Sequence, residues 1–175
     1  MFRNGSDYMG VKWTTKKNQF PKMETSIKQL DGKKVSVGVL GGGESAWLAS
    51  IHEYGCKIPV TEKMRKYLGA TGLHLKKSTK FIVIPERAFL RNGYDESKDE
   101  VLNSAEQTLG DVIGGTMSAD QFLEIVGLLL SSKIKDYARD LDSPPNHPYT
   151  VERKGSSNPL VSTGDMIGSI TYKVE

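Results

Sequence analysis

Three glycines between a strand pattern and a helix pattern form the first candidate for a chemical site. Gly41-x-Gly43-x-x-Ala46 matches the loose dinucleotide-binding spacing, in which amides at a helix N-terminus bind a phosphate. That motif needs an acidic residue about twenty positions on, after a second parallel strand. Glu62 stands there, but within a helix pattern, and Glu44 adds negative charge beside the glycines. We therefore interpret the glycines as a flexible strand-to-helix connection.

Histidines and the cysteine are the next candidates. His52-Glu53 begins like a zinc-protease motif, but the residue four positions after His52 is Cys56, and His74 and His147 do not stand at ligand spacing. The single cysteine excludes an internal disulfide, and no G-x-S-x-G nucleophile motif occurs. We assign no catalytic residue, no metal ligand and no cofactor, and we expect a protein that is not an enzyme.

Charge is unevenly distributed along the chain, although the net charge is only +3. Residues 57–91 hold nine basic and two acidic residues, whereas residues 92–142 hold four basic and eleven acidic ones. Two interpretations of this contrast stay open: two solvated faces, or complementary contact between copies of the chain. A basic band with nearby aromatic side chains also fits non-specific nucleic-acid contact; it comprises Lys63, Arg65, Lys66, Lys76, Lys77, Lys80, Arg87 and Arg91.

Apolar spacing predicts the elements that position these residues in the first half of the chain. It indicates a short helix after Pro21, a strand over 35–39, a helix over 45–54 and a second short helix over 61–68. Residues 73–84 are expected to be extended, with a hairpin turn at 76–80. The polar and basic residues 1–20 show no period, and we expect a flexible or partner-ordered arm.

The second half of the chain is predicted to be mainly helical. A helix is expected from Pro85, with Arg87 and Arg91 on one face and a capping box at Ser97-x-x-Glu100. Another helix should follow the capping box at Ser118 and end before the prolines that open a loop of about fifteen residues. A turn capped by Ser162 then leads to a strand over 170–174, placed beside 35–39.

These elements together predict a single α+β domain over 21–175. We expect a small, mostly antiparallel sheet packed against two longer helices. No stretch approaches the ~18 apolar residues of a membrane helix, and the first residues lack an apolar signal core. We therefore expect no membrane contact.

Three phrases, taken in order, resemble one protein family. They are LASIHEYG over 48–55, IPERAFLR over 84–91 and NPLVSTGDMIGSITYKV over 158–174. The chain resembles the neck and tail-completion (virion morphogenesis) proteins of long-tailed bacteriophages. In that family A-x-x-x-E-F/Y-G is followed by I-P-x-R-P-F-L-R and a final P-L-x-x-T-G-x-x-x-x-S-I-x-Y-x-V. The resemblance covers 35–175. Ala88 replaces a common proline, a change expected to matter little, and 57–81 is interpreted as an insertion.

The resemblance implies a virion structural protein of the neck, assembled in the host cytoplasm. It implies a homo-oligomeric ring around the DNA channel, with six as the expected number of subunits. Its partners would be connector or head-completion proteins and tail-terminator or tail-tube proteins, and tail completion, tail termination and head stopping all fit. Two other classes stay open: a small basic nucleic-acid-binding protein, and a nucleotide-binding enzyme that uses Gly41–Gly43.

Overall fold

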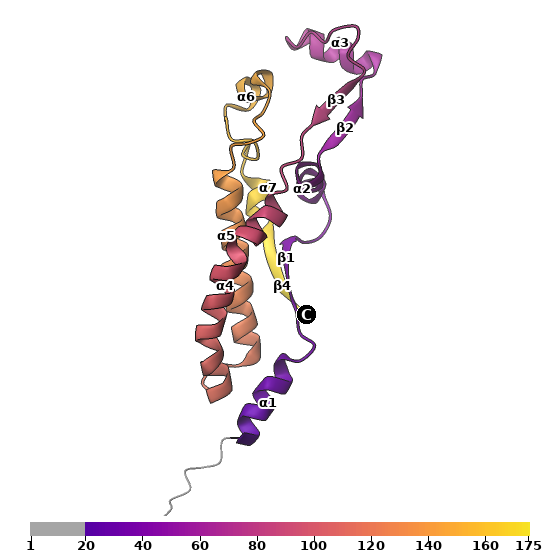
Figure 1. Ribbon diagram of the computed structural model, residues 1–175. Helices are drawn as coiled ribbons and strands as arrows, with labels where there is room; N and C mark the ends of the chain where they lie inside the picture. Colours follow the sequence, from indigo (N-terminus) through magenta and orange to yellow (C-terminus); the bar gives the residue numbers. More distant parts are fainter. Residues whose placement is uncertain (1–19) are drawn as a thin grey trace, which may run out of the picture.

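A computed structural model describes residues 20–175, so the predicted arm lies outside the described residues except for Phe20. The α+β prediction is confirmed (Figure 1). The elements in chain order are α1 (Phe20–Leu30), β1 (Val35–Val39), α2 (Glu44–Tyr54), β2 (Cys56–Pro59), α3 (Glu62–Ala70), β3 (Phe81–Ile84), α4 (Phe89–Gly114), α5 (Ala119–Asp140), α6 (Pro148–Lys154), α7 (Asp165–Gly168) and β4 (Ile170–Val174).

The core sheet, as we name the β1–β4 pair, joins two distant parts of the chain as predicted. The strands are antiparallel, and Val39 pairs with Ile170 while Val35 pairs with Val174. Alternating side chains of both strands face α5, and Ile170 is fully buried. At Gly127 of α5 an added Cβ would lie only 2.4 Å from the Tyr172 ring. A glycine is therefore required there for the sheet to approach the helix.

Helices α4 and α5 form a long antiparallel pair beside the core sheet (Figure 1). At Gly93 an added Cβ would lie 3.3 Å from the Cα of Ile134, so the two helices approach closely. The predicted capping box at Ser118 is confirmed, because its hydroxyl accepts from the Gln121 amide and the Gln121 side chain accepts from the Ser118 amide. The predicted box at Ser97 is wrong: Ser97 is buried within one continuous helix.

A second sheet, formed by β2 and β3, projects from the rest of the molecule. The sequence analysis predicted β3 but not β2. Residues 81–84 are extended as expected, but they pair with β2 rather than with 73–75, so the predicted hairpin turn at 76–80 is wrong. We name β2, α3, the 71–80 loop and β3 the hairpin arm, which stands at one end of the molecule in Figure 1. Thr61 caps α3 as predicted, accepting from the Met64 amide. The arm contains the predicted insertion, which itself stays a prediction.

The region after α5 is more ordered than the loop predicted from its prolines. Helix α6 occupies part of it, with His147 as its N-cap and a proline at the first helical turn. Asn158 then caps the end of α5, because its side-chain amide donates to the carbonyl of Leu141. The predicted cap at Ser162 is wrong: Gly164 precedes α7, and the Thr163 hydroxyl donates to Asp165 at 2.7 Å.

Candidate functional site

A buried carboxylate connects the end of α2 to the start of α4. Glu53 is 2% exposed, and its oxygens accept from the backbone amides of Leu90 and Arg91 at 2.9 and 3.2 Å. The Arg91 guanidinium also donates to Glu53 at 2.8 Å and to the exposed Glu86 at 2.7 Å. Glu53 thus satisfies amides that the first turn of α4 leaves without helical partners. This carboxylate stabilises the fold and is not available to solvent.

A buried guanidinium binds the neighbouring histidine. Arg87 is 4% exposed and donates to His52 Nδ1 at 2.8 Å, to the Asn146 side chain at 3.0 Å and to the Pro144 carbonyl at 3.1 Å. Burial, then the charges of Arg87 and Lys154, lower the pKa of His52 from 6.5 to about 4. His52 is therefore neutral at pH 7, with Nδ1 as an acceptor. His52 is thus a partly buried, hydrogen-bonded residue near the end of α2.

The segment between these two contacts has an unusual backbone. Ala88 is the residue before α4 and has φ 46°, in the left-handed region. Proline fixes φ near −65°, so a proline at position 88 would not fit this backbone; what the replacement means for the resemblance stays a prediction. Arg87 precedes the helix, so it does not share a helix face with Arg91 as predicted. Their side chains bind different partners, His52 and Glu53.

The three phrases of the resemblance meet in one place. The Arg87 amide donates to the His52 carbonyl at 2.8 Å, which joins the first phrase to the second. Asn146, held by Arg87, donates in turn to the Pro159 carbonyl of the third. All three contribute to one buried cluster, which comprises Ala49, Phe89, Ile134, Ala138, Leu141, Leu160, Met166, Ile167 and Ile170. Side chains that resembled functional motifs therefore hold distant segments together.

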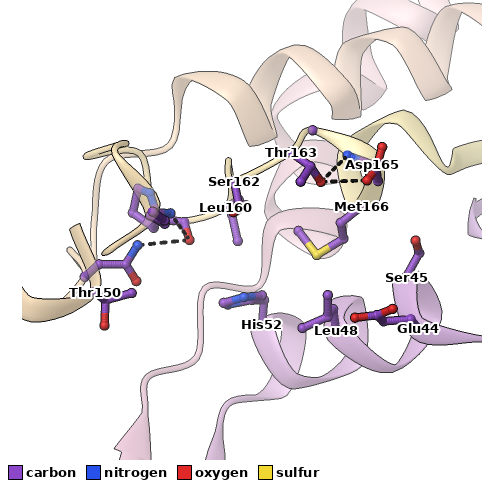
Figure 2. Close-up of a pocket in the computed structure, with 14 residues that line it drawn as sticks. Glu44, Ser45, Leu48, His52, Thr150, Leu160, Ser162, Thr163, Asp165 and Met166 are labelled. Atoms are coloured by element: carbon purple, nitrogen blue, oxygen red, sulfur yellow. Dashed lines mark hydrogen bonds between the residues drawn. The ribbon is translucent and has the colours of Figure 1, made fainter. Parts of the chain in front are cut away.

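A cleft of about 480 Å³ lies beside this cluster, between α2 and the segment that leads to α7. Figure 2 shows Glu44, Leu48 and His52 on one side and Thr163 and Met166 on the other. Its one lysine, Lys154, already donates to the Asn158 carbonyl, at 2.5 Å. The cleft places two carboxylates, Glu44 and Asp165, at the end of the glycine connection. These charges repel a phosphate.

The glycine connection itself lacks the sheet of a dinucleotide site. Gly41 and Gly43 have φ of 106° and 102°, which only glycine adopts readily, so they provide a turn before α2. Within residues 20–175, β1 pairs with β4 alone, and the pair is antiparallel. A dinucleotide-binding unit needs a second parallel strand beside the first. The structural arrangement supports our interpretation of the glycines as a connection.

Metal-ligating side chains do not gather in the described part of the chain. No group of three or more His, Cys, Asp or Glu side chains lies within reach of one ion among residues 20–175. Cys56 lies in β2, opposite Ile84, and is partly buried. No described helix is both long and apolar enough to cross a membrane.

The predicted basic band separates into structural and exposed residues. Arg87 and Arg91 bind the junction described above. Arg65 donates to the carbonyls of Leu75, Lys76 and Thr79, at 2.8 to 3.2 Å, and so folds the loop after α3. The five lysines remain exposed on the hairpin arm: Lys63, Lys66, Lys76, Lys77 and Lys80. Sequence alone did not distinguish arginines that bind carbonyls from lysines that face solvent.

An acidic cleft on the α4–α5 pair was also missed. It has a volume of about 480 Å³, and its charged lining residues are Glu96, Lys133, Asp140 and Asp142. The signal was present in the sequence: eleven acidic residues between 92 and 142, two of them at the end of the strongest helix pattern.

Comparison with known proteins adds no assignment, because no protein-family model, curated protein or solved structure matches the chain.

Proposed function

We propose that this chain is a structural protein of a phage neck, acting in tail completion or head-to-tail joining. One observation carries the proposal: the three phrases that resemble the neck family, far apart in sequence, converge on the buried cluster. Glu53 and Arg87 join the first two phrases by hydrogen bonds, and Arg87 also binds Asn146, which donates to the Pro159 carbonyl of the third. A shared fold requires such residues, whereas an enzyme would place its distinctive polar residues within reach of a substrate.

The proposed mechanism is assembly of identical subunits into a ring around the DNA channel, with six as the expected number. Large apolar side chains remain exposed on several elements, and we propose that neighbours cover two groups of them. On the hairpin arm they are Phe81 and Val83, which are 46% and 66% exposed. On the α4–α5 pair they are Leu102, Ile125 and Leu128, which are 59%, 45% and 61% exposed. Two different surfaces of this kind suit a head-to-tail contact, which forms a ring when the rotation from one subunit to the next closes.

The proposed ring would contact connector or head-completion proteins on one side and tail-terminator or tail-tube proteins on the other. It would be assembled in the host cytoplasm and incorporated into the virion. Shape and charge complementarity would select the partners and their register. We propose no catalytic step and no cofactor for this role.

The test is the assembly state of the purified full-length chain. Mass photometry should show a closed oligomer of defined subunit number, and negative-stain images should show rings with a central channel. A protein that stays monomeric at the concentrations used for imaging would contradict the proposal. The same holds for one that forms open fibres of undefined length.

Exposed lysines favour one second candidate, a nucleic-acid-binding protein. Six of them lie on the hairpin arm, and Tyr67 beside them is 60% exposed, as a stacking side chain would be. Phosphate contacts of this kind would make binding to a DNA duplex fall steeply with salt. A stable monomer with such binding would favour this candidate over the ring. Fluorescence anisotropy with labelled DNA, read together with mass photometry, separates the two.

A further inference from the structure

The 71–80 loop at the tip of the hairpin arm is positively charged, and hydrogen bonds fix its backbone. Lys76, Lys77 and Lys80 are exposed, and in the described part of the chain none of their ammonium groups makes an ion pair. Their backbone is nevertheless fixed, because Arg65 donates to the carbonyls of Lys76 and Thr79 at 2.9 and 2.8 Å. The loop therefore presents three lysines from a single backbone conformation, which reduces the entropy lost on binding.

The orientation of the arm is also fixed at its tip. The Thr71 hydroxyl lies 2.6 Å from the Tyr149 hydroxyl of α6, and Arg153 donates to the same tyrosine at 3.1 Å. Figure 1 shows the arm extending from the end of the molecule, away from the length of the α4–α5 pair. The three exposed lysines thus lie on a part of the arm whose position is fixed.

The acidic cleft on the α4–α5 pair carries the opposite charge to the three lysines. Glu96, Asp140 and Asp142 line it and are exposed, and none of the three makes an ion pair within residues 20–175. The one basic residue of the lining, Lys133, is already paired with Glu100 at 2.6 Å. Tyr137 and Leu141 complete one wall. Their apolar surfaces suit the aliphatic part of lysine side chains.

We propose that the arm-tip loop of one copy docks in the acidic cleft of the next copy, three lysines against three carboxylates. The inference rests on the proposed ring and names the surfaces by which its subunits meet. Loop and cleft are different surfaces of one chain, so the contact is heterologous and repeats around a ring. A metal ion is a poorer occupant, because no three carboxylates of the described chain converge on one point.

Charge reversal and its rescue test this docking in the full-length chain. The loop variant is Lys76→Glu, Lys77→Glu and Lys80→Glu, and the cleft variant is Glu96→Lys, Asp140→Lys and Asp142→Lys. The control reverses three exposed acids elsewhere that make no described ion pair, Asp31, Glu106 and Glu152. Self-association is measured by mass photometry and sedimentation velocity, in salt from about 50 mM to about 500 mM. Circular dichroism verifies folding of each variant.

Each reversal alone should weaken self-association about 100-fold, more strongly at low salt, while the control changes it less than about threefold. The chain that carries both reversals restores opposite charges, and it should recover association to within about tenfold of the original. An equimolar mixture of the two single variants should assemble with the two chains alternating, because every loop-to-cleft contact between unlike chains then joins opposite charges, whereas contacts between like chains stay repulsive. Rescue is the decisive outcome, because a folding defect cannot produce it.

Several outcomes overturn the docking. Rings that persist unchanged in both single variants would overturn it and leave the proposed ring intact. Dimers that weaken with salt, that do not grow into a closed ring and that are lost in the charge-reversal variants would support the docking and overturn the ring. A lack of rescue in the double variant would overturn the pairing of these two surfaces. Loss of association on reversing Lys12, Lys16 and Lys17 instead would show that the N-terminal segment occupies the cleft.

Discussion

The two sheets in the described part of the chain have the same number of strands and opposite surroundings. Each is an antiparallel pair of short strands. The core sheet packs against α5, and its Ile170 is 0% exposed. The hairpin arm instead leaves Val83 66% exposed, although its pairing with β2 is equally regular. Strand pairing alone is thus a poor guide to which part of a small protein forms its core.

The difference shows what a pair of strands needs from its surroundings. An isolated two-stranded hairpin is marginally stable in water, so each sheet depends on other contacts. The core sheet obtains them from the buried cluster, through Val37 and Val39. The arm obtains them from polar contacts: Arg65 with its loop, Thr71 with Tyr149, and Lys57 over the Phe81 ring at 4.5 Å. Burial supports the first sheet, whereas the second keeps exposed apolar surface at Phe81 and Val83.

The largest predicted effect is a clash between α5 and the core sheet. Gly127→Ala would place a Cβ 2.4 Å from the Tyr172 ring, so we expect a loss of about 2–3 kcal/mol in the free energy of unfolding. Gly110→Ala is the matched control, since nothing lies within 4 Å of that position in α4. It should stabilise the protein by about 0.5–1 kcal/mol. Urea unfolding followed by circular dichroism measures both, and equal effects would contradict close packing at Gly127.

The second effect concerns the junction between the core and the arm. Glu53→Gln keeps the size of the side chain but weakens its hydrogen bonds to the Leu90 amide and to Arg91. Because these donors are buried or charged, we expect a loss of about 2 kcal/mol. Glu86→Gln is the control: it removes the exposed partner of the same guanidinium and should cost less than about 0.5 kcal/mol. Equal losses from both variants in urea titrations would refute the capping role.

A third, smaller effect should appear as a pH dependence at the same junction. The pKa of His52 is about 4 in the folded protein and 6.5 in the unfolded chain, so the unfolded chain binds more protons between these values. Stability should therefore fall as the pH decreases from 7 to 4. After a discount for partial exposure, His52 contributes about 1–2 kcal/mol to this change. In His52→Asn this part of the slope should disappear; an unchanged slope would assign it to other groups.

The smallest effect compares one substitution in both sheets. Val37→Thr adds a hydroxyl beside the buried cluster and should cost about 1 kcal/mol. Val83→Thr puts the same hydroxyl on the exposed face of the arm, where the expected change is below about 0.5 kcal/mol. Thermal unfolding at a concentration where the protein is monomeric measures the difference. A larger loss at Val83 would mean that the arm is covered within the monomer.

Elements with a local signal were predicted well from the sequence. The strand over 35–39 alternates apolar and small residues, and α5 begins at a capping box formed by residues three positions apart. The pairing of β1 with β4 was inferred because both ends of the domain alternate in the same way. These features depend on residues close together in the chain or on the spacing of apolar residues, and a single sequence shows both.

Features that depend on distant residues were missed. The strand Cys56–Pro59 is short and contains a proline, so only its pairing with β3 identifies it. The start of α4 was misplaced because its amides are capped by Glu53, a residue of another helix, rather than by a nearby side chain. The absence of a catalytic site, metal ligand or cofactor was a prediction, and it stays one. The acidic cleft required the spatial meeting of Glu96 with Asp140 and Asp142.

The pairing of β1 with β4 has a consequence for biosynthesis. A ribosome makes β1 early and β4 only after every other described element. Until β4 emerges, β1 has no partner strand for its backbone hydrogen bonds. Helix α5 also lacks the Tyr172 ring that packs on Gly127. Such non-local pairing folds slowly and exposes strand edges in the meantime. The domain is therefore expected to become protease-resistant in one late step, after β4 has left the ribosome.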